Sequence, residues 1–66
     1  MPEPIKDATL KNIEMGIHWY WTTGWIDSQI AQMQAKVDDG DAGTRIVDAL
    51  AELKEERARR SVAFRH

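Results

Sequence analysis

The chain has 66 residues, of which 42% are hydrophobic and 30% are charged, and its formal net charge is −2. A chain this short forms one small core, and below about 70–80 residues a disulfide, a metal or a partner chain usually supplements it. The absence of cysteine excludes disulfides and thiolate metal sites. With no signal-peptide pattern and no apolar run of roughly 18 residues, we expect a cytoplasmic protein without a membrane span.

The first part of the chain predicts an arm followed by a helix. Residues 1–6 are expected to be extended, because two prolines restrict the backbone there. A helix is predicted over residues 7–24, with Asp7 or Thr9 as its N-cap and Gly24 as its end. Its apolar side chains recur at the spacing of one helical face: Leu10, Ile13, Ile17 and Tyr20 or Trp21.

Two further helices are predicted beyond this segment. The first covers residues 27–38 and begins at Asp27 or Ser28, which are both good N-caps. Its apolar stripe consists of Ile26, Ile30, Met33 and Val37. After a run of turn-forming residues, another helix is predicted over residues 44–62, where strong helix formers predominate. Its stripe consists of Ile46, Leu50 and Leu53.

The segment from Ile17 to Trp25 also permits a strand. Aromatic and β-branched residues alternate along it, which is typical of strands. A lone strand has no pairing partner in a chain whose other segments read as helices, so it requires a second copy of the chain. We therefore favour a helix here and keep the strand as the alternative.

The aromatic residues of this segment predict association with a partner. Three tryptophans and a tyrosine occur within seven residues, more than one small core readily buries. On a helical wheel Met15 and Trp19 lie opposite the apolar stripe, leaving a second apolar face. Large aromatic residues and methionine are enriched at the centres of protein interfaces. The predicted partner-binding residues are Met15, Trp19, Tyr20 and Trp25 as anchors, with Arg57 and Arg60 as a charged rim.

Few residues are available for catalysis or metal binding. His18 is the only internal histidine and follows Glu14 by four residues, so the plain interpretation is a polar pair on one helical face. The acidic segment that contains Asp39 and Asp41 departs from the calcium-loop pattern and is expected to be a helix stop and a cap. We expect no enzymatic activity, no metal and no cofactor.

Nucleic-acid binding is the alternative function. Residues 1–41 carry seven acids and three bases, whereas residues 42–66 carry four acids and six bases. The basic residues of a DNA contact would be Lys54, Arg57, Arg59, Arg60 and Arg65. Glutamates alternate with these bases at i,i+4 spacing, Glu55 with Arg59 and Glu56 with Arg60, and a solvated, ion-paired face explains that pattern without DNA.

The sequence as a whole predicts an all-α protein. Residues 1–66 are expected to form a single small domain of two to three helices, arranged as a helical hairpin and packed as an oligomeric helical bundle. A homodimer is the simplest such assembly. The predicted function is protein binding, as a small regulatory adaptor, inhibitor or assembly factor whose partner the sequence does not identify.

Overall fold

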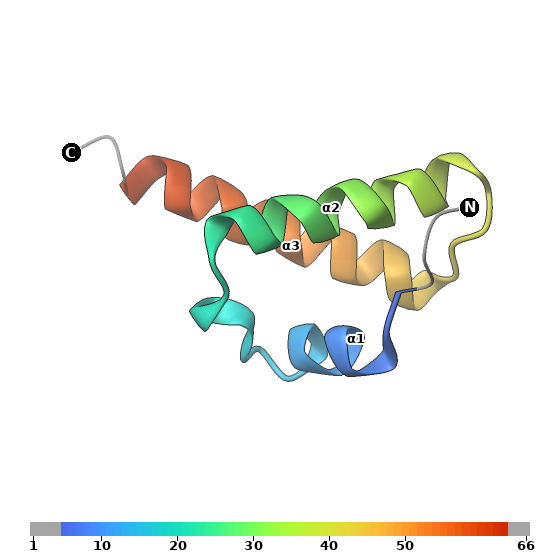
Figure 1. Cartoon of the computed structure of the whole chain (residues 1–66), viewed down its shortest axis with the longest axis horizontal. Helices are drawn as coiled ribbons and strands as arrows, with labels where there is room; N and C mark the ends of the chain where they lie inside the picture. Colours follow the sequence, from blue (N-terminus) through green and yellow to red (C-terminus); the bar gives the residue numbers. More distant parts are fainter. Residues whose placement is uncertain (1–4, 64–66) are drawn as a thin grey trace.

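The computed structural model describes residues 5–63, and its fold consists of helices joined by short connections. The elements are helix α1 (Asp7–Glu14), the 3₁₀ turn η1 (His18–Tyr20), helix α2 (Thr23–Asp38) and helix α3 (Thr44–Ala63), with no strand in this range. Figure 1 shows α2 and α3 as an antiparallel hairpin with α1 beside it. The predicted all-α fold with a helical hairpin is confirmed. Residues 1–4 of the predicted arm lie outside the described range, and Lys6 has an extended backbone.

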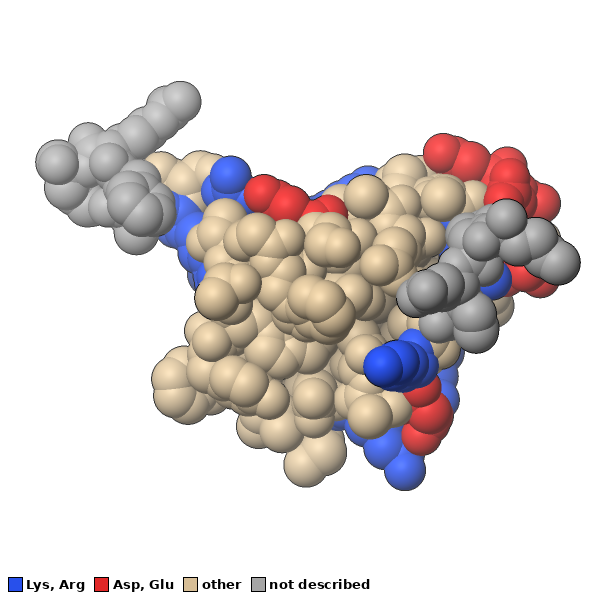
Figure 2. Space-filling model, in the orientation of Figure 1, with Lys and Arg blue, Asp and Glu red and all other residues tan. Residues whose placement is uncertain are grey.

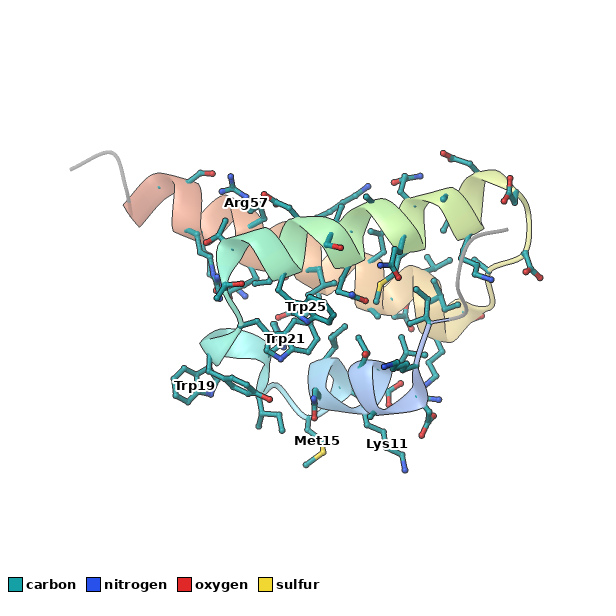
Figure 3. All side chains as sticks on the ribbon, viewed as in Figure 1. Lys11, Met15, Trp19, Trp21, Trp25 and Arg57 are labelled. Carbon is teal, nitrogen blue, oxygen red and sulfur yellow. The ribbon has the colours of Figure 1, made fainter. Side chains whose placement is uncertain are left out.

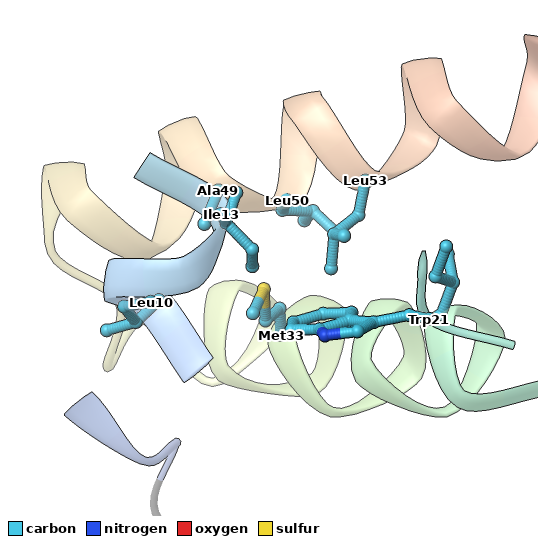
Figure 4. Packing of buried hydrophobic residues seen from close by; sticks show 8 residues of the cluster. Leu10, Ile13, Trp21, Met33, Ala49, Leu50 and Leu53 are labelled. Carbon is cyan, nitrogen blue, oxygen red and sulfur yellow. The ribbon is translucent and has the colours of Figure 1, made fainter. Parts of the chain in front are cut away.

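The core lies between the three helices. Both α1 and α2 pack against α3. Ile26, Met33 and Leu53 are fully buried, and burying a side chain of this size contributes about 1.5–3 kcal/mol. The buried residues shown in Figure 4 come from every helix and from the connection between α1 and α2: Leu10, Ile13, Trp21, Ile26, Met33, Ala49, Leu50 and Leu53.

Helix α1 ends ten residues before the predicted boundary. The cause is Gly16, whose φ of 73° lies in the left-handed region that glycine adopts without strain. The amide of Gly16 donates to the carbonyl of Ile13, and the amide of Ile17 donates to that of Asn12. These two bonds satisfy the last carbonyls of the helix and form a Schellman motif. Gly16, and not Gly24, is therefore the glycine that ends the first helix.

Helix α2 begins earlier than predicted, at Thr23. Its N-cap is Thr22, whose hydroxyl accepts a hydrogen bond from the amide of Trp25 at 3.1 Å. Gly24 thus lies in the first turn of α2, and the predicted caps Asp27 and Ser28 lie inside the helix.

The 3₁₀ turn and the start of α2 occupy the segment that was open to a strand interpretation. Its side chains follow the predicted apolar stripe only at Trp21. Ile17 and Tyr20 are exposed, whereas Trp21 is buried. Because the helix stops at Gly16, the 3.6-residue period that would have carried Ile17 into the core is lost there.

The last two boundaries agree with the sequence patterns. Helix α2 ends at Asp38, where Gly40 with φ 73° forms a second Schellman motif. Helix α3 begins at Thr44 as predicted and extends to Ala63, one residue beyond the predicted end.

Arg45 on α3 joins both ends of α1 to the hairpin. Its guanidinium donates to Asp7 Oδ1 at 2.6 Å and to Glu14 Oε2 at 2.6 Å. No side chain caps the N-terminus of α1, because the N-cap position is Lys6 rather than Asp7 or Thr9. The hydrogen bonds from Arg45 hold the pKa of Asp7 and that of Glu14 below their usual values.

Replacing Leu53 tests whether α3 supplies the centre of the core. We expect Leu53→Ala to lower the free energy of unfolding by about 2–5 kcal/mol, because it leaves a cavity where both other helices meet α3. Urea unfolding followed by circular dichroism measures this loss. The control Val62→Ala changes an exposed residue of the same helix and should stay within about 0.5 kcal/mol of the parent. Equal losses in the two variants would contradict this location of the core.

The Arg45 contacts predict a dependence of stability on pH. A carboxyl whose pKa is lower in the folded chain stabilises it above the ordinary pKa of about 4, and this contribution is lost as the pH falls through the folded value. We expect Arg45→Gln to flatten the dependence of unfolding free energy on pH below about 5. Urea unfolding at several pH values measures the slope. Lys54→Gln removes one positive charge elsewhere and should keep the parent slope.

Candidate functional site

Five large apolar side chains that the core leaves in solvent lie on η1 and beside it. We call them the aromatic patch: Met15, Ile17, Trp19, Tyr20 and Trp25. Trp19 is 70% exposed, Met15 68%, Tyr20 58% and Trp25 48%. In Figure 3 the side chains of Trp19 and Met15 extend away from the helices. The rings of Trp19 and Tyr20 meet edge to face, with their centroids 6.0 Å apart.

The size of the aromatic patch approaches that of a protein interface. Since an aromatic side chain has about 150–250 Å² of surface, the exposed parts of Trp19, Tyr20 and Trp25 amount to roughly 350 Å². One side of a standard interface buries about 800 Å², of which a little over half is apolar. With Met15 and Ile17 added, the patch supplies most of that apolar area.

The turn that carries the patch is fixed to the hairpin from its inner side. Trp21 packs in the core and meets Trp25 edge to face, with ring centroids 6.4 Å apart. His18 is buried, and its Nε2 lies 3.3 Å from Glu52 Oε1 on α3. The predicted pairing of His18 with Glu14 is therefore wrong, because Glu14 binds Arg45 and the end of α1 at Gly16 separates the two side chains.

One ring nitrogen of His18 makes no hydrogen bond to the described residues. This atom, Nδ1, is buried. No group of three or more metal-binding side chains occurs among the described residues.

The patch continues into a face that carries almost no charge. The chain contains nine basic and 11 acidic residues, yet only Asp27 among them falls between Met15 and Ala35. Asp27 accepts a hydrogen bond from Arg57 and is thereby paired within the chain. Figure 2 shows the result, a broad uncharged face with the charged side chains at its edges. Depletion of charge distinguishes interface centres from other surfaces. The same depletion is visible in the sequence, although it did not enter the prediction of the interface.

The basic residues predicted to contact a partner make bonds within the chain. Arg57 donates to Asp27 at 2.9 Å and to Ser61 at 2.8 Å. Lys54 donates to the side chain of Gln34 on α2 at 2.9 Å. These three contacts tie α3 to α2 or to its own last turns. A nucleic acid would have to compete with them for these side chains.

The remaining bases of α3 form a cluster with its glutamates. Arg59 donates to Glu56 at 2.8 Å and to Glu52 at 3.3 Å, rather than to Glu55 as the spacing predicted. The predicted pair of Arg60 with Glu56 is present, at 2.9 Å. Hydrogen bonds from Arg59 and then from Arg60 hold the pKa of Glu56 below its usual value. Arg65 lies outside the described residues.

The structure brings together only part of the predicted site. Met15, Trp19, Tyr20 and Trp25 are all exposed, as is Ile17, and they come from η1 and the segments that flank it. Arg57 is turned toward Asp27, with which it forms an ion pair at 2.9 Å. Within the described residues, no helix is both long and apolar enough to cross a membrane.

Comparison with known proteins supplies no relative. No protein-family model matches the chain, and no curated protein or solved structure is significantly similar to it.

Proposed function

We propose that this chain is a small, non-catalytic protein-interaction module that pairs with a second copy of itself through the aromatic patch. The observation that carries the proposal is the exposure of Trp19 and Tyr20 on the anchored turn η1 and of Met15 at the end of α1. A single exposed apolar residue is ordinary on a protein surface, whereas a cluster of this size marks an association site.

Charge supports a second copy as the partner. Two identical chains of net charge −2 repel each other, and contact through an uncharged surface adds no close pairs of like charges to that repulsion. The aromatic patch and the neighbouring face of α2 form such a surface, because Asp27 is their only acidic or basic residue and is already paired with Arg57. A two-fold dimer also joins the same patch from both chains, which doubles the aromatic area that leaves water.

The area of the aromatic patch supports a modest interface. Its aromatic part of roughly 350 Å² per chain suits an interface near the standard size, with the adjacent polar residues of α2 as its rim. A dimer on this surface leaves α3 outside the contact. The outer face of α3 is then available for the adaptor, inhibitor or assembly role that the sequence suggested.

The alternative of nucleic-acid binding has weaker support. Lys54, Arg57 and Arg59 each donate to a side chain of the same molecule. To contact phosphate groups, these side chains would have to break their hydrogen bonds within the chain. We expect no complex with duplex DNA in a mobility-shift assay at low salt. A complex that weakens steeply with salt and is lost on replacing Arg57 and Arg59 would favour the alternative.

Substitution of Trp19 tests the proposed interface. We expect Trp19→Ala to raise the dimer dissociation constant by about tenfold or more, because a large aromatic residue at the centre of an interface contributes about 2 kcal/mol. The fold should be retained, since Trp19 is outside the core. Analytical ultracentrifugation over a wide concentration range measures the constant, and far-ultraviolet circular dichroism checks the helices.

The matched control is Val47→Ala, which truncates an exposed apolar side chain on α3 away from the patch. This variant should associate as the parent does. If Trp19→Ala also associates like the parent, the aromatic patch is not the interface. A parent chain that remains monomeric at high concentration would contradict self-association altogether.

A further inference from the structure

Arg60 links three elements through one side chain. Its Nε donates to Glu56 on α3 at 2.9 Å, and its Nη1 donates to the hydroxyl of Thr23 in the first turn of α2 at 3.2 Å. Its Nη2 donates to the backbone carbonyl of Trp19 in η1 at 3.0 Å. The side chain is 16% exposed, whereas that of its neighbour Arg59 is 55% exposed.

The 3₁₀ turn depends on contacts of this kind. A turn of three residues has few hydrogen bonds of its own, and their geometry is poor. Trp21 donates its amide to the carbonyl of His18, and this bond closes η1. Because Trp19 and Tyr20 face solvent, packing does not fix that side of the turn. The bond from Arg60 reaches η1 at Trp19 itself.

From these contacts we propose that Arg60 is a positioning residue for the aromatic patch. It holds η1 against α3, so that Trp19 and Tyr20 are presented in one arrangement before a partner binds. A surface that is ordered in advance loses less conformational entropy on association. This inference rests on the proposed function, and it differs from the predicted role of Arg60 as part of a charged rim, because the guanidinium is directed to acceptors within the chain.

The geometry requires arginine at this position. A guanidinium has five N–H donors in a plane and serves three separate acceptors, whereas the ammonium of lysine is a single compact donor group on a flexible stem. Lysine can retain the ion pair with Glu56 but does not span Glu56, Thr23 and the Trp19 carbonyl together. Arg60→Lys therefore separates the effect of charge from that of position.

The experiment compares Arg60→Gln, Arg60→Lys and the control Arg59→Gln with the parent chain. Two quantities are measured on each: the dimer dissociation constant and the hydrogen-exchange rate of the Trp21 amide, which closes η1. We expect both Arg60 variants to exchange Trp21 faster and to dimerise roughly tenfold more weakly, as the lost hydrogen bonds and the added ordering cost imply. Arg59→Gln loses the same charge but only contacts within α3, and should match the parent in both measurements.

Exchange of the Trp25 amide, which Thr22 caps at the start of α2, shows whether an effect is confined to η1. Faster exchange at Trp25 by the same factor would show general destabilisation and would overturn the positioning role. Full association of Arg60→Lys would also overturn it, because charge alone would then suffice.

The two proposals fail in different ways. If Trp19→Ala weakens the dimer and Arg60→Gln does not, the patch remains the interface and the role of Arg60 is wrong. If the parent does not dimerise, both proposals fall. If Trp19→Ala dimerises like the parent, the patch and its positioning by Arg60 are rejected together.

Discussion

The buried strip on α3 that faces both other helices is the contact on which the fold depends. It consists of Ala49, Leu50 and Leu53, and both α1 and α2 pack against this helix. A chain of 66 residues has too little apolar surface for a second core, so each element is stable only where it reaches this strip. The polar contacts of α3 follow the same plan, since Arg45 binds α1, Arg57 binds α2 and Arg60 binds η1.

That constraint also explains the aromatic patch. The connection between α1 and α2 contributes one large hydrophobic residue, Trp21, to the core, and the buried His18 lies beside it. Trp19 and Tyr20 lie between these two residues on a tight turn and remain in solvent. These rings are exposed because one small core can bury only a limited number of large side chains. A second molecule is the remaining means of removing them from water.

The sequence was sufficient for the fold class and for two helices, and insufficient for the turn between them. The stripes through Met33 and Leu53 have a helical period, and the structure packs all their members in or against the core, with Ile30, Val37 and Ile46 only partly buried. The first helix was extended too far because Ile17 and Tyr20 happen to continue its period past Gly16. A left-handed glycine is decided by backbone conformation, and Gly16 and Gly24 were equally suitable on composition alone. Residue type did not distinguish the actual N-cap, Thr22, from Asp27 and Ser28, because all three residue types are favourable N-caps.

The candidate site was likewise predictable from the sequence only in part. Met15, Trp19, Tyr20 and Trp25 could be identified because the sequence contains more large apolar residues than one small core can bury, and the structure leaves these four exposed. The contacts of Arg57 and Arg60 with α2 and η1 could not be predicted, since these partners lie 30 and 41 residues away in sequence. Only the packing of η1 against α3 brings a backbone carbonyl within reach of Arg60.

The three tryptophans differ in burial, and this difference affects the fluorescence of the chain. Trp21 is buried, Trp25 is half exposed and Trp19 is largely exposed. The indole emission of the unmodified chain therefore combines separate environments. Unfolding transfers Trp21 to water and shifts its emission to longer wavelength, whereas covering Trp19 shifts its emission to shorter wavelength. Loss of the fold and closure of the patch thus have opposite spectral signs, without any added label.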